Sequence, residues 1–284
     1  MTLSPPDDAP AVEADDRRSQ LGQRLRRLSD EGVGTGLHWW AEALLVLAFY
    51  VVYTWSRNQF GSASVDPSVA LDNAQRVIDL EKAMGLFQEL RIQEWFLDWT
   101  RFLQGWNLFY GTCHFGVTIF TLVWLYRRFP VLYPRWRSSF LCTTGLALVG
   151  FSLFPLMPPR LLADCGEFGG CLAAYPFVDT LAEVGGLWSF DSGTMQKVSN
   201  QYAAMPSLHF AWASWCTLAL WPVLQRTWTR ILVAAYPVAT LFAVIVTGNH
   251  YWIDAAGGVA VLAAGVLLGR LLADGWHRWS SRRT

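Results

Sequence analysis

Six long apolar segments constrain the fold of this chain of 284 residues more than any other feature. The hydrocarbon core of a bilayer is about 30 Å thick, so a helix that crosses it needs about 20 mostly apolar residues. Segments of roughly this length lie at residues 39–55, 102–126, 139–154, 206–224, 231–247 and 251–272. The sequence therefore predicts an all-α, polytopic membrane protein with six transmembrane helices.

The composition agrees with this prediction. Of all residues, 53% are hydrophobic and only 15% are charged, whereas a soluble domain has about 25% charged residues. Many of the 16 Trp stand near the ends of apolar segments, as in the aromatic belts at the two surfaces of a membrane. A net charge of zero provides no basic surface for a nucleic acid. We therefore exclude nucleic acid as a partner and expect membrane lipids around the chain.

Lys and Arg are unevenly distributed between the segments that join the apolar runs. With the N-terminus inside the cell, 15 lie on the cytoplasmic side and 7 on the outer side. Positive residues favour cytoplasmic loops, so both termini are predicted to be cytoplasmic. No small-residue cleavage site follows the first run, which predicts an uncleaved anchor. Residues 1–36 are then a disordered cytoplasmic tail, residues 37–274 the membrane domain and residues 275–284 a second tail.

Two segments on the predicted outer side are too long to be turns. Residues 69–99 repeat apolar residues at helical spacing, with Gly85 as a break, which predicts a pair of amphipathic helices at the membrane interface. Residues 155–205 contain four Pro and several Gly and are predicted to form an outer loop. Within this loop Cys165 and Cys171 enclose the sequence GEFGG, and the oxidising outer side permits a disulfide between them.

Two of the five His lie where the fourth and the sixth apolar runs begin. His209 occurs in NQYAAMPSLHF, where Pro206 suits the first helical position and the N–H groups of the starting helix can bind a phosphate. His250 occurs in TGNHYWIDAAGG, where Asp254 lies one helical turn later on the same face. A carboxylate there can hold one ring N–H of His250 and leave the other nitrogen as a nucleophile. The pattern predicts two helix starts at one anion, with a nucleophilic His and a proton-transferring His.

The same residues allow other interpretations. A His and an Asp one turn apart can form a purely structural hydrogen bond, and a His at a membrane surface is often only an amphipathic anchor, as we expect for His38 and His277. Paired His side chains can also ligate haem, although such ligands usually lie within the spans. A metal site formed by His209, His250 and Asp254 would lack an obvious fourth ligand.

His114 is an ionisable residue in the middle of the second apolar run. Such residues are functional candidates by default and often line a wet cavity. A hydrogen bond between two helices explains His114 equally well, so it is a secondary candidate.

The motifs PSLH at residues 206–209 and HYWID at residues 250–254 resemble the second and third motifs of the phosphatidic acid phosphatase type 2 superfamily. The forms AAMPSLH and HYxxD are most similar to the branch of fungal inositol phosphorylceramide synthase and its bacterial relatives, and HYxxD also resembles sphingomyelin synthases. The resemblance extends over nearly all of residues 40–273. It implies a membrane enzyme, which we expect in a bacterial plasma membrane with its active site on the extracytoplasmic side.

The resemblance also implies a role for each site residue. His250 would form a phosphohistidine, Asp254 would orient it, and His209 would protonate the leaving alkoxide, with no metal or other cofactor. The first motif of the superfamily, a Lys and an Arg-Pro pair, is absent as such, and Arg160 is its nearest counterpart and the candidate phosphate clamp. Val244 stands where soluble members carry an Arg six residues before the His. Further candidate ligands of the phosphate are Ser207, Lys197, Asn200, Gln201 and Tyr202.

The acceptor of the phosphoryl group decides the activity. The resemblance implies transfer of a phosphoinositol-like head group from a phospholipid to the hydroxyl of a lipid or glycan. If water is the acceptor, the same site is a lipid phosphate phosphatase that hydrolyses phosphatidate or a polyprenyl diphosphate. A function of another class is transport of an anionic lipid, although the chain lacks the two matching helical halves of many transporters.

Overall fold

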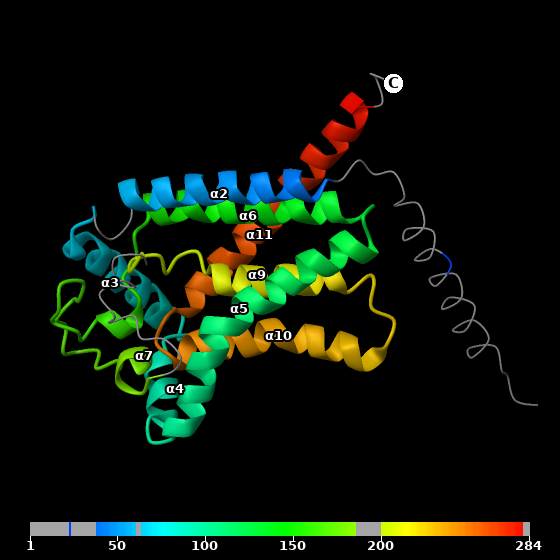
Figure 1. The fold of residues 1–284 in the computed structure, drawn as a ribbon. Helices are drawn as coiled ribbons and strands as arrows, with labels where there is room; N and C mark the ends of the chain where they lie inside the picture. The colour runs from blue at the N-terminus through cyan, green and yellow to red at the C-terminus, as the bar shows by residue number, and fades with distance from the viewer. Residues whose placement is uncertain (1–22, 24–37, 61–63, 186–199, 281–284) are drawn as a thin grey trace, which may run out of the picture.

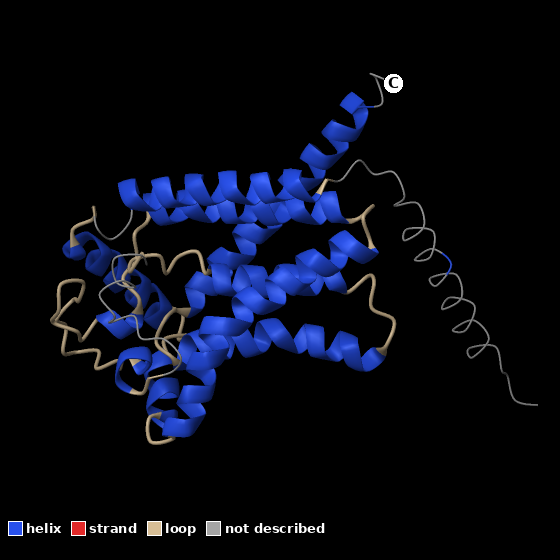
Figure 2. Cartoon of the chain, in the orientation of Figure 1, coloured by secondary structure: helices blue, strands red, loops and turns tan. Residues whose placement is uncertain are grey.

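The structure is a computed structural model, and it describes residue 23 and residues 38–60, 64–185 and 200–280. In these ranges the chain forms helices and loops, and a single bridge between Leu156 and Ala203 is the only strand-like pairing, as Figure 2 shows. The predicted all-α fold is confirmed. Apart from residue 23, the predicted tail at residues 1–36 lies outside the described residues, as does Lys197.

Each of the six predicted apolar segments coincides with one helix. These are α2 (Trp39–Phe60), α5 (Thr100–Arg128), α6 (Tyr133–Leu153), α9 (Leu208–Leu220), α10 (Thr227–Val246) and α11 (Trp252–Ser280). Three of them, α5, α10 and the first 22 residues of α11, are long and apolar enough to cross a membrane. They indicate an integral membrane protein. The apolar part of α2 and the whole of α9 are shorter, so six spans stay a prediction.

The most extensive packing between two helices of the bundle is that of α11 against α6. A Cβ atom added at Gly265 would collide with Thr143, and one added at Gly269 would collide with the backbone of Ser139. Two glycines one turn apart let two membrane helices approach closely. Helix α9 packs against α5, α6, α10 and α11, and its buried Trp215 donates a hydrogen bond of 3.0 Å to the Ser139 hydroxyl. α9, which carries His209, is therefore held from several sides.

Helix α2 lies along α6 at the edge of the bundle (Figure 1). A polar contact with α6 uses Glu42, which pairs with Arg137 and accepts a hydrogen bond of 3.0 Å from the Tyr133 hydroxyl. Along the rest of the helix, large apolar side chains are exposed. They are Trp39, Trp40, Leu44, Val46, Leu47, Tyr50, Val51, Val52 and Trp55. Such a face suits contact with lipid.

The predicted amphipathic pair forms α3 (Pro67–Ala83) and α4 (Glu89–Phe96), joined by a turn in which Gly85 has a φ of +70°. Figure 1 shows both helices at one end of the bundle, together with the outer loop and its short helix α7 (Thr180–Glu183). The predicted apolar face of α3 is not free to contact lipid, because Ala74 and Ile78 are buried against Leu156 and its neighbours in the outer loop. The apolar side chains that stay exposed on this pair are Val69, Leu80, Met84, Leu86, Trp95 and Trp99.

Candidate active site

The start of α9 is fixed by Ser207, which is fully buried. Its side chain accepts a hydrogen bond from the Phe210 N–H at 3.4 Å, and its own N–H donates to the Asp254 carbonyl at 2.9 Å. The sequence predicted Pro206 at the first helical position, but Pro206 precedes the cap because Ser207 takes the capping role. Ser207, a candidate phosphate ligand, thus joins the helix of His209 to the helix of Asp254.

Glycines let the two motif-bearing segments approach each other. A Cβ atom at Gly258 of α11 would lie 2.7 Å from the Ser207 carbonyl oxygen. Pro206 fits between Gly257 of α11 and Gly150 of α6, where added Cβ atoms would lie 3.3 Å and 2.6 Å from its ring. At Gly258 the backbone of α11 faces the backbone of Ser207 directly. The distance between the starts of α9 and α11 therefore depends on the absence of these Cβ atoms.

His250 and Asp254 form the pair that their spacing predicts. His250 Nδ1 lies 3.1 Å from Asp254 Oδ2, and the same oxygen accepts the Tyr251 N–H at 2.9 Å. Asp254 is fully buried, and His250 is 4% exposed. An ionised carboxylate only accepts hydrogen bonds, so the ring proton must lie on Nδ1. This tautomer leaves Nε2 of His250 with a free electron pair.

The C-terminus of α10 presents His250 on a tight turn. Gly248 follows the last helical residues with a φ of +70°, the left-handed conformation in which helices often end. The N–H groups of Asn249 and His250 then donate to the Val244 carbonyl at 2.9 Å and 3.2 Å. Val244 therefore holds the His250 backbone, although its side chain provides no cation for a phosphate.

His209 lies in a stack of aromatic rings beside His250. Its ring centroid is 5.7 Å from that of His250, 4.3 Å from that of Tyr110 and 4.2 Å from that of His114. His114 in turn stacks on Trp212 at 4.4 Å. The secondary candidate His114 thus lies next to His209. The two residues contact each other through their rings. Nδ1 of His114 meets no hydrogen-bond partner among the described residues.

Arg160 reaches the segment of His250 from the outer loop. Its backbone N–H donates to the Gly248 carbonyl at 2.7 Å, and its Nε donates to Asn249 Oδ1 at 3.1 Å. The two terminal nitrogens donate to Asp179 and Gln201, each at 2.6 Å. The planar guanidinium can serve three partners because its donors form a rigid fork. Arg160 is thus the one buried cation near His250 among the described residues. Asn249, the residue directly before His250, links the two.

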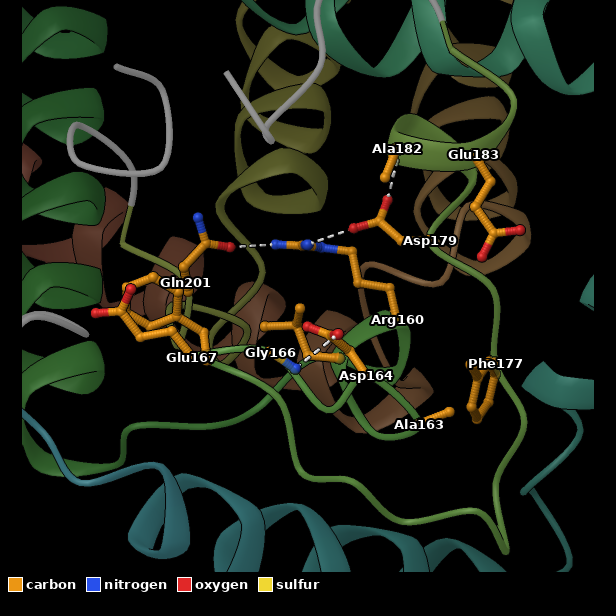
Figure 3. Close-up of a pocket in the computed structure, with 12 residues that line it drawn as sticks. Arg160, Ala163, Asp164, Gly166, Glu167, Phe177, Asp179, Ala182, Glu183 and Gln201 are labelled. Carbon is orange, nitrogen blue, oxygen red and sulfur yellow. Dashed lines mark hydrogen bonds and ion pairs between the residues drawn. The ribbon is translucent and has the colours of Figure 1, made fainter. Parts of the chain in front are cut away.

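A cavity of about 360 Å³ opens beside Arg160 (Figure 3). Figure 3 shows the guanidinium between Gln201 and Asp179. The lining includes the carboxyl groups of Asp164, Glu167, Asp179 and Glu183. His209 and His250 are not among the described lining residues, so Arg160 and Asn249 connect the cavity with the histidines.

Two further candidates, Asn200 and Tyr202, flank Gln201 along the chain. Asn200 Oδ1 accepts the Tyr202 N–H at 3.2 Å, and the Tyr202 hydroxyl donates to the Phe168 carbonyl at 3.1 Å. Burial raises the pKa of Tyr202 to about 12, so its hydroxyl stays a donor at neutral pH. The outer loop also contains a disulfide between Cys165 and Cys171.

Several neighbours of the site were not expected from the sequence. Asp179 caps the four-residue helix α7 and pairs with Arg160. In the sequence it belongs to no motif, so it could not be distinguished from other Asp residues in loops. Asn249 precedes His250 directly, and only the position of Arg160 gives it a role. Among the described residues no three His, Cys, Asp or Glu side chains gather in a metal-binding arrangement.

One of three comparisons with known proteins finds a match. A search of curated proteins and a search of solved structures each found no match. A protein-family model described as the PAP2 superfamily matches residues 75–268. This range covers more than half of the chain and includes Arg160, both His motifs and Asp254. The chain therefore belongs to the PAP2 superfamily, whose members are lipid phosphatases and phosphotransferases.

Proposed function

We propose that this enzyme moves a phosphoryl head group, of the phosphoinositol type, from a phospholipid to an acceptor hydroxyl through a phosphohistidine at His250. One observation carries the proposal: the His250–Asp254 pair lies beside His209, at the end of the chain of contacts that leads through Asn249 to Arg160. A nucleophile, a proton-transferring group and a cation are the three parts that this reaction needs.

The first half of the reaction transfers the head group to the enzyme. The electron pair on His250 Nε2 attacks phosphorus, and the bond between phosphorus and the diacylglycerol oxygen breaks. His209 gives its proton to that oxygen, so diacylglycerol leaves as a neutral alcohol. Asp254 stabilises the positive charge that the ring of His250 gains, and Arg160 binds the phosphate oxygens.

The second half returns the enzyme to its starting state. The acceptor hydroxyl attacks phosphorus and gives its proton to His209, while the bond between phosphorus and His250 Nε2 breaks. The product is the acceptor that carries the head-group phosphate. Water as the acceptor turns the same steps into hydrolysis, so access of water to His250 decides between transferase and phosphatase.

The cavity beside Arg160 supports a donor with a head group. Phosphatidate has no group beyond its phosphate, whereas a cavity of about 360 Å³ next to the clamp has room for a polar ring. The carboxyl groups that line it accept hydrogen bonds from hydroxyls and repel a second phosphate. A head group rich in hydroxyls fits this lining.

We also propose that residues 37–274 form one catalytic unit that crosses the membrane six times. The bias of Lys and Arg supports a cytoplasmic location for both termini, and with six spans the starts of α9 and α11 would lie on the outer side. Both catalytic His lie at these starts. The reacting phosphate accordingly lies on the extracytoplasmic side, at the depth of the lipid head groups.

An assay of two labelled donors tests the activity. Purified protein in mixed micelles receives either phosphatidylinositol labelled in the inositol ring or phosphatidate labelled in the phosphate, with and without a lipid alcohol, and the products are separated by thin-layer chromatography. We expect label from phosphatidylinositol on the added alcohol. Release of phosphate from phosphatidate, with phosphatidylinositol left intact, would instead identify a phosphatase. His38→Ala, at an exposed His that directly precedes α2, is the control for His209→Ala and His250→Ala.

A further inference from the structure

Two buried carboxyl groups from α3 and α4 meet at the first turn of α11. Glu81 and Glu89 are both 0% exposed. Glu81 Oε1 accepts the Ile253 N–H at 2.8 Å, and Glu89 Oε1 accepts the Trp252 N–H at 3.2 Å. The first N–H groups of a helix have no partner within the helix, and negative charge is favourable there. The two side chains therefore anchor the helix that begins directly after His250 and Tyr251.

The second oxygens of the two carboxyl groups, Oε2 of Glu81 and Oε2 of Glu89, are buried and meet no donor among the described residues. The two carboxyl groups lie side by side, because their Oε1 atoms accept from the N–H groups of consecutive residues, Trp252 and Ile253. Two ionised carboxylates cannot hydrogen-bond to each other, because both only accept. A single shared proton satisfies both buried oxygens, which would otherwise stay unpaired at a considerable cost in free energy.

The surroundings of this pair also favour the protonated form. Among the described residues, the titratable groups that interact with this pair are Asp254, in the first turn of α11, and Tyr251, which directly precedes the helix. Lys82, the cation next to Glu81 along the chain, is directed elsewhere and donates to the Tyr175 hydroxyl at 2.7 Å. Burial, followed by the hydrogen bond with Glu89, raises the pKa of Glu81 from its ordinary value of 4.5 to about 9.

We propose that Glu81 and Glu89 form a singly protonated carboxyl pair that anchors the start of α11 and thereby positions His250 and Asp254. The pair binds two successive N–H groups of α11 with one negative charge instead of two. A second charge would lie close to Asp254 and would repel both that carboxylate and a phosphate at His250. Glu81 and Glu89 are thus positioning residues, and they act through the backbone of Trp252 and Ile253.

This inference rests on the proposed function for the roles of His250 and Asp254, but the pair itself can be tested without any substrate. Infrared spectra of the purified protein at neutral pH should contain the C=O band of a buried protonated carboxyl group. This band should disappear in Glu81→Gln and should be lost from the wild type as the pH rises through about 9. Absence of the band from the wild type at neutral pH would overturn the shared proton.

Thermal unfolding in detergent gives a second test without substrate. A pKa that is raised in the folded state stabilises the protein below pH 4.5, and this contribution falls as the pH rises from 4.5 to about 9. The midpoint of unfolding should therefore fall over this range in the wild type and fall less in Glu81→Gln. Asp79→Asn and Glu94→Gln change exposed carboxylates of α3 and α4 and should keep the wild-type slope.

Turnover then tests the positioning role. Glu81→Ala leaves the Ile253 N–H without its partner, so we expect kcat to fall by about 10²-fold, the size of effect that a displacement of about 1 Å can have, while KM changes little. Glu81→Gln keeps an acceptor for Ile253 and a donor for Glu89 and should recover most of this loss. Wild-type turnover in a folded Glu81→Ala protein would overturn the positioning role. Lack of activity in the wild type with every donor would count against the proposed function only, because the spectra and unfolding curves test the pair independently.

Discussion

The proton on the His250 ring is controlled by a single carboxylate, Asp254. Asp254→Asn keeps an acceptor for the Tyr251 N–H, so we expect the variant to fold. An amide has a donor as well as an acceptor, so it no longer excludes the wrong tautomer of His250, and it does not stabilise a positive ring. We expect kcat to fall by about 10²–10⁴-fold, as is usual for such positioned groups. A variant with the wild-type rate and an unchanged unfolding midpoint would mean that the pair is only structural.

The Arg160 side chain donates hydrogen bonds to Asn249, Asp179 and Gln201. Substitutions of Arg160 and of Asp179 should therefore change the use of the donor in opposite directions. Arg160→Lys loses the fork that serves three partners, and turnover at low donor concentration should fall about tenfold or more, since one charged hydrogen bond is worth about 1.5–3 kcal/mol. Asp179→Asn removes the carboxylate that competes with phosphate for the guanidinium, and Asn still caps a helix. Its KM for the donor should therefore fall.

The control for both variants is Asp72→Asn, which changes an exposed carboxylate of α3 that is not among the described residues lining the cavity. Steady-state kinetics of the three proteins separate the effects. Equal kcat/KM values for Arg160→Lys and the wild type would remove Arg160 from the phosphate site.

The contact between the starts of α9 and α11 depends on Gly258. In Gly258→Ala the new Cβ would lie 2.7 Å from the Ser207 carbonyl oxygen, so one helix start must move. A shift of about 1 Å between His209 and His250 can cost about 10²-fold in rate. Gly145→Ala is the matched control, because a Cβ atom there meets nothing within 4 Å. Similar rates for the two variants would show that this contact does not set the geometry of the site.

The helices were predictable because each apolar segment of the sequence becomes one helix. The His–Asp pair was predictable from its spacing of four residues, although His250 itself precedes α11, which begins at Trp252. Contacts between distant segments were not. Glu81 and Glu89 look like ordinary charges of an amphipathic helix, yet they lie buried against Ile253 and Trp252, more than 160 residues away along the chain. The periodicity of α3 correctly predicted an apolar face, but not what this face contacts. The face packs on the outer loop instead of on lipid.

The topology of the whole molecule follows from the number of spans, and labelling tests it. Single-Cys variants Ala174→Cys and Gln225→Cys, in a background without the native cysteines, place a thiol at an exposed site in the outer loop and in the α9–α10 connection. In intact cells a membrane-impermeant thiol reagent should label position 174 and spare position 225. The opposite pattern would place the site, with both histidines, on the cytoplasmic side.

Detection of the covalent intermediate tests the central claim most directly. The purified protein is incubated without an acceptor with phosphatidylinositol labelled at phosphorus, quenched in alkali to preserve phosphohistidine, digested and analysed by mass spectrometry. The wild type should carry the labelled phosphoryl head group on the peptide that contains His250, and His250→Ala should carry none. Label on another residue, or labelled product formed by His250→Ala, would contradict the proposed mechanism.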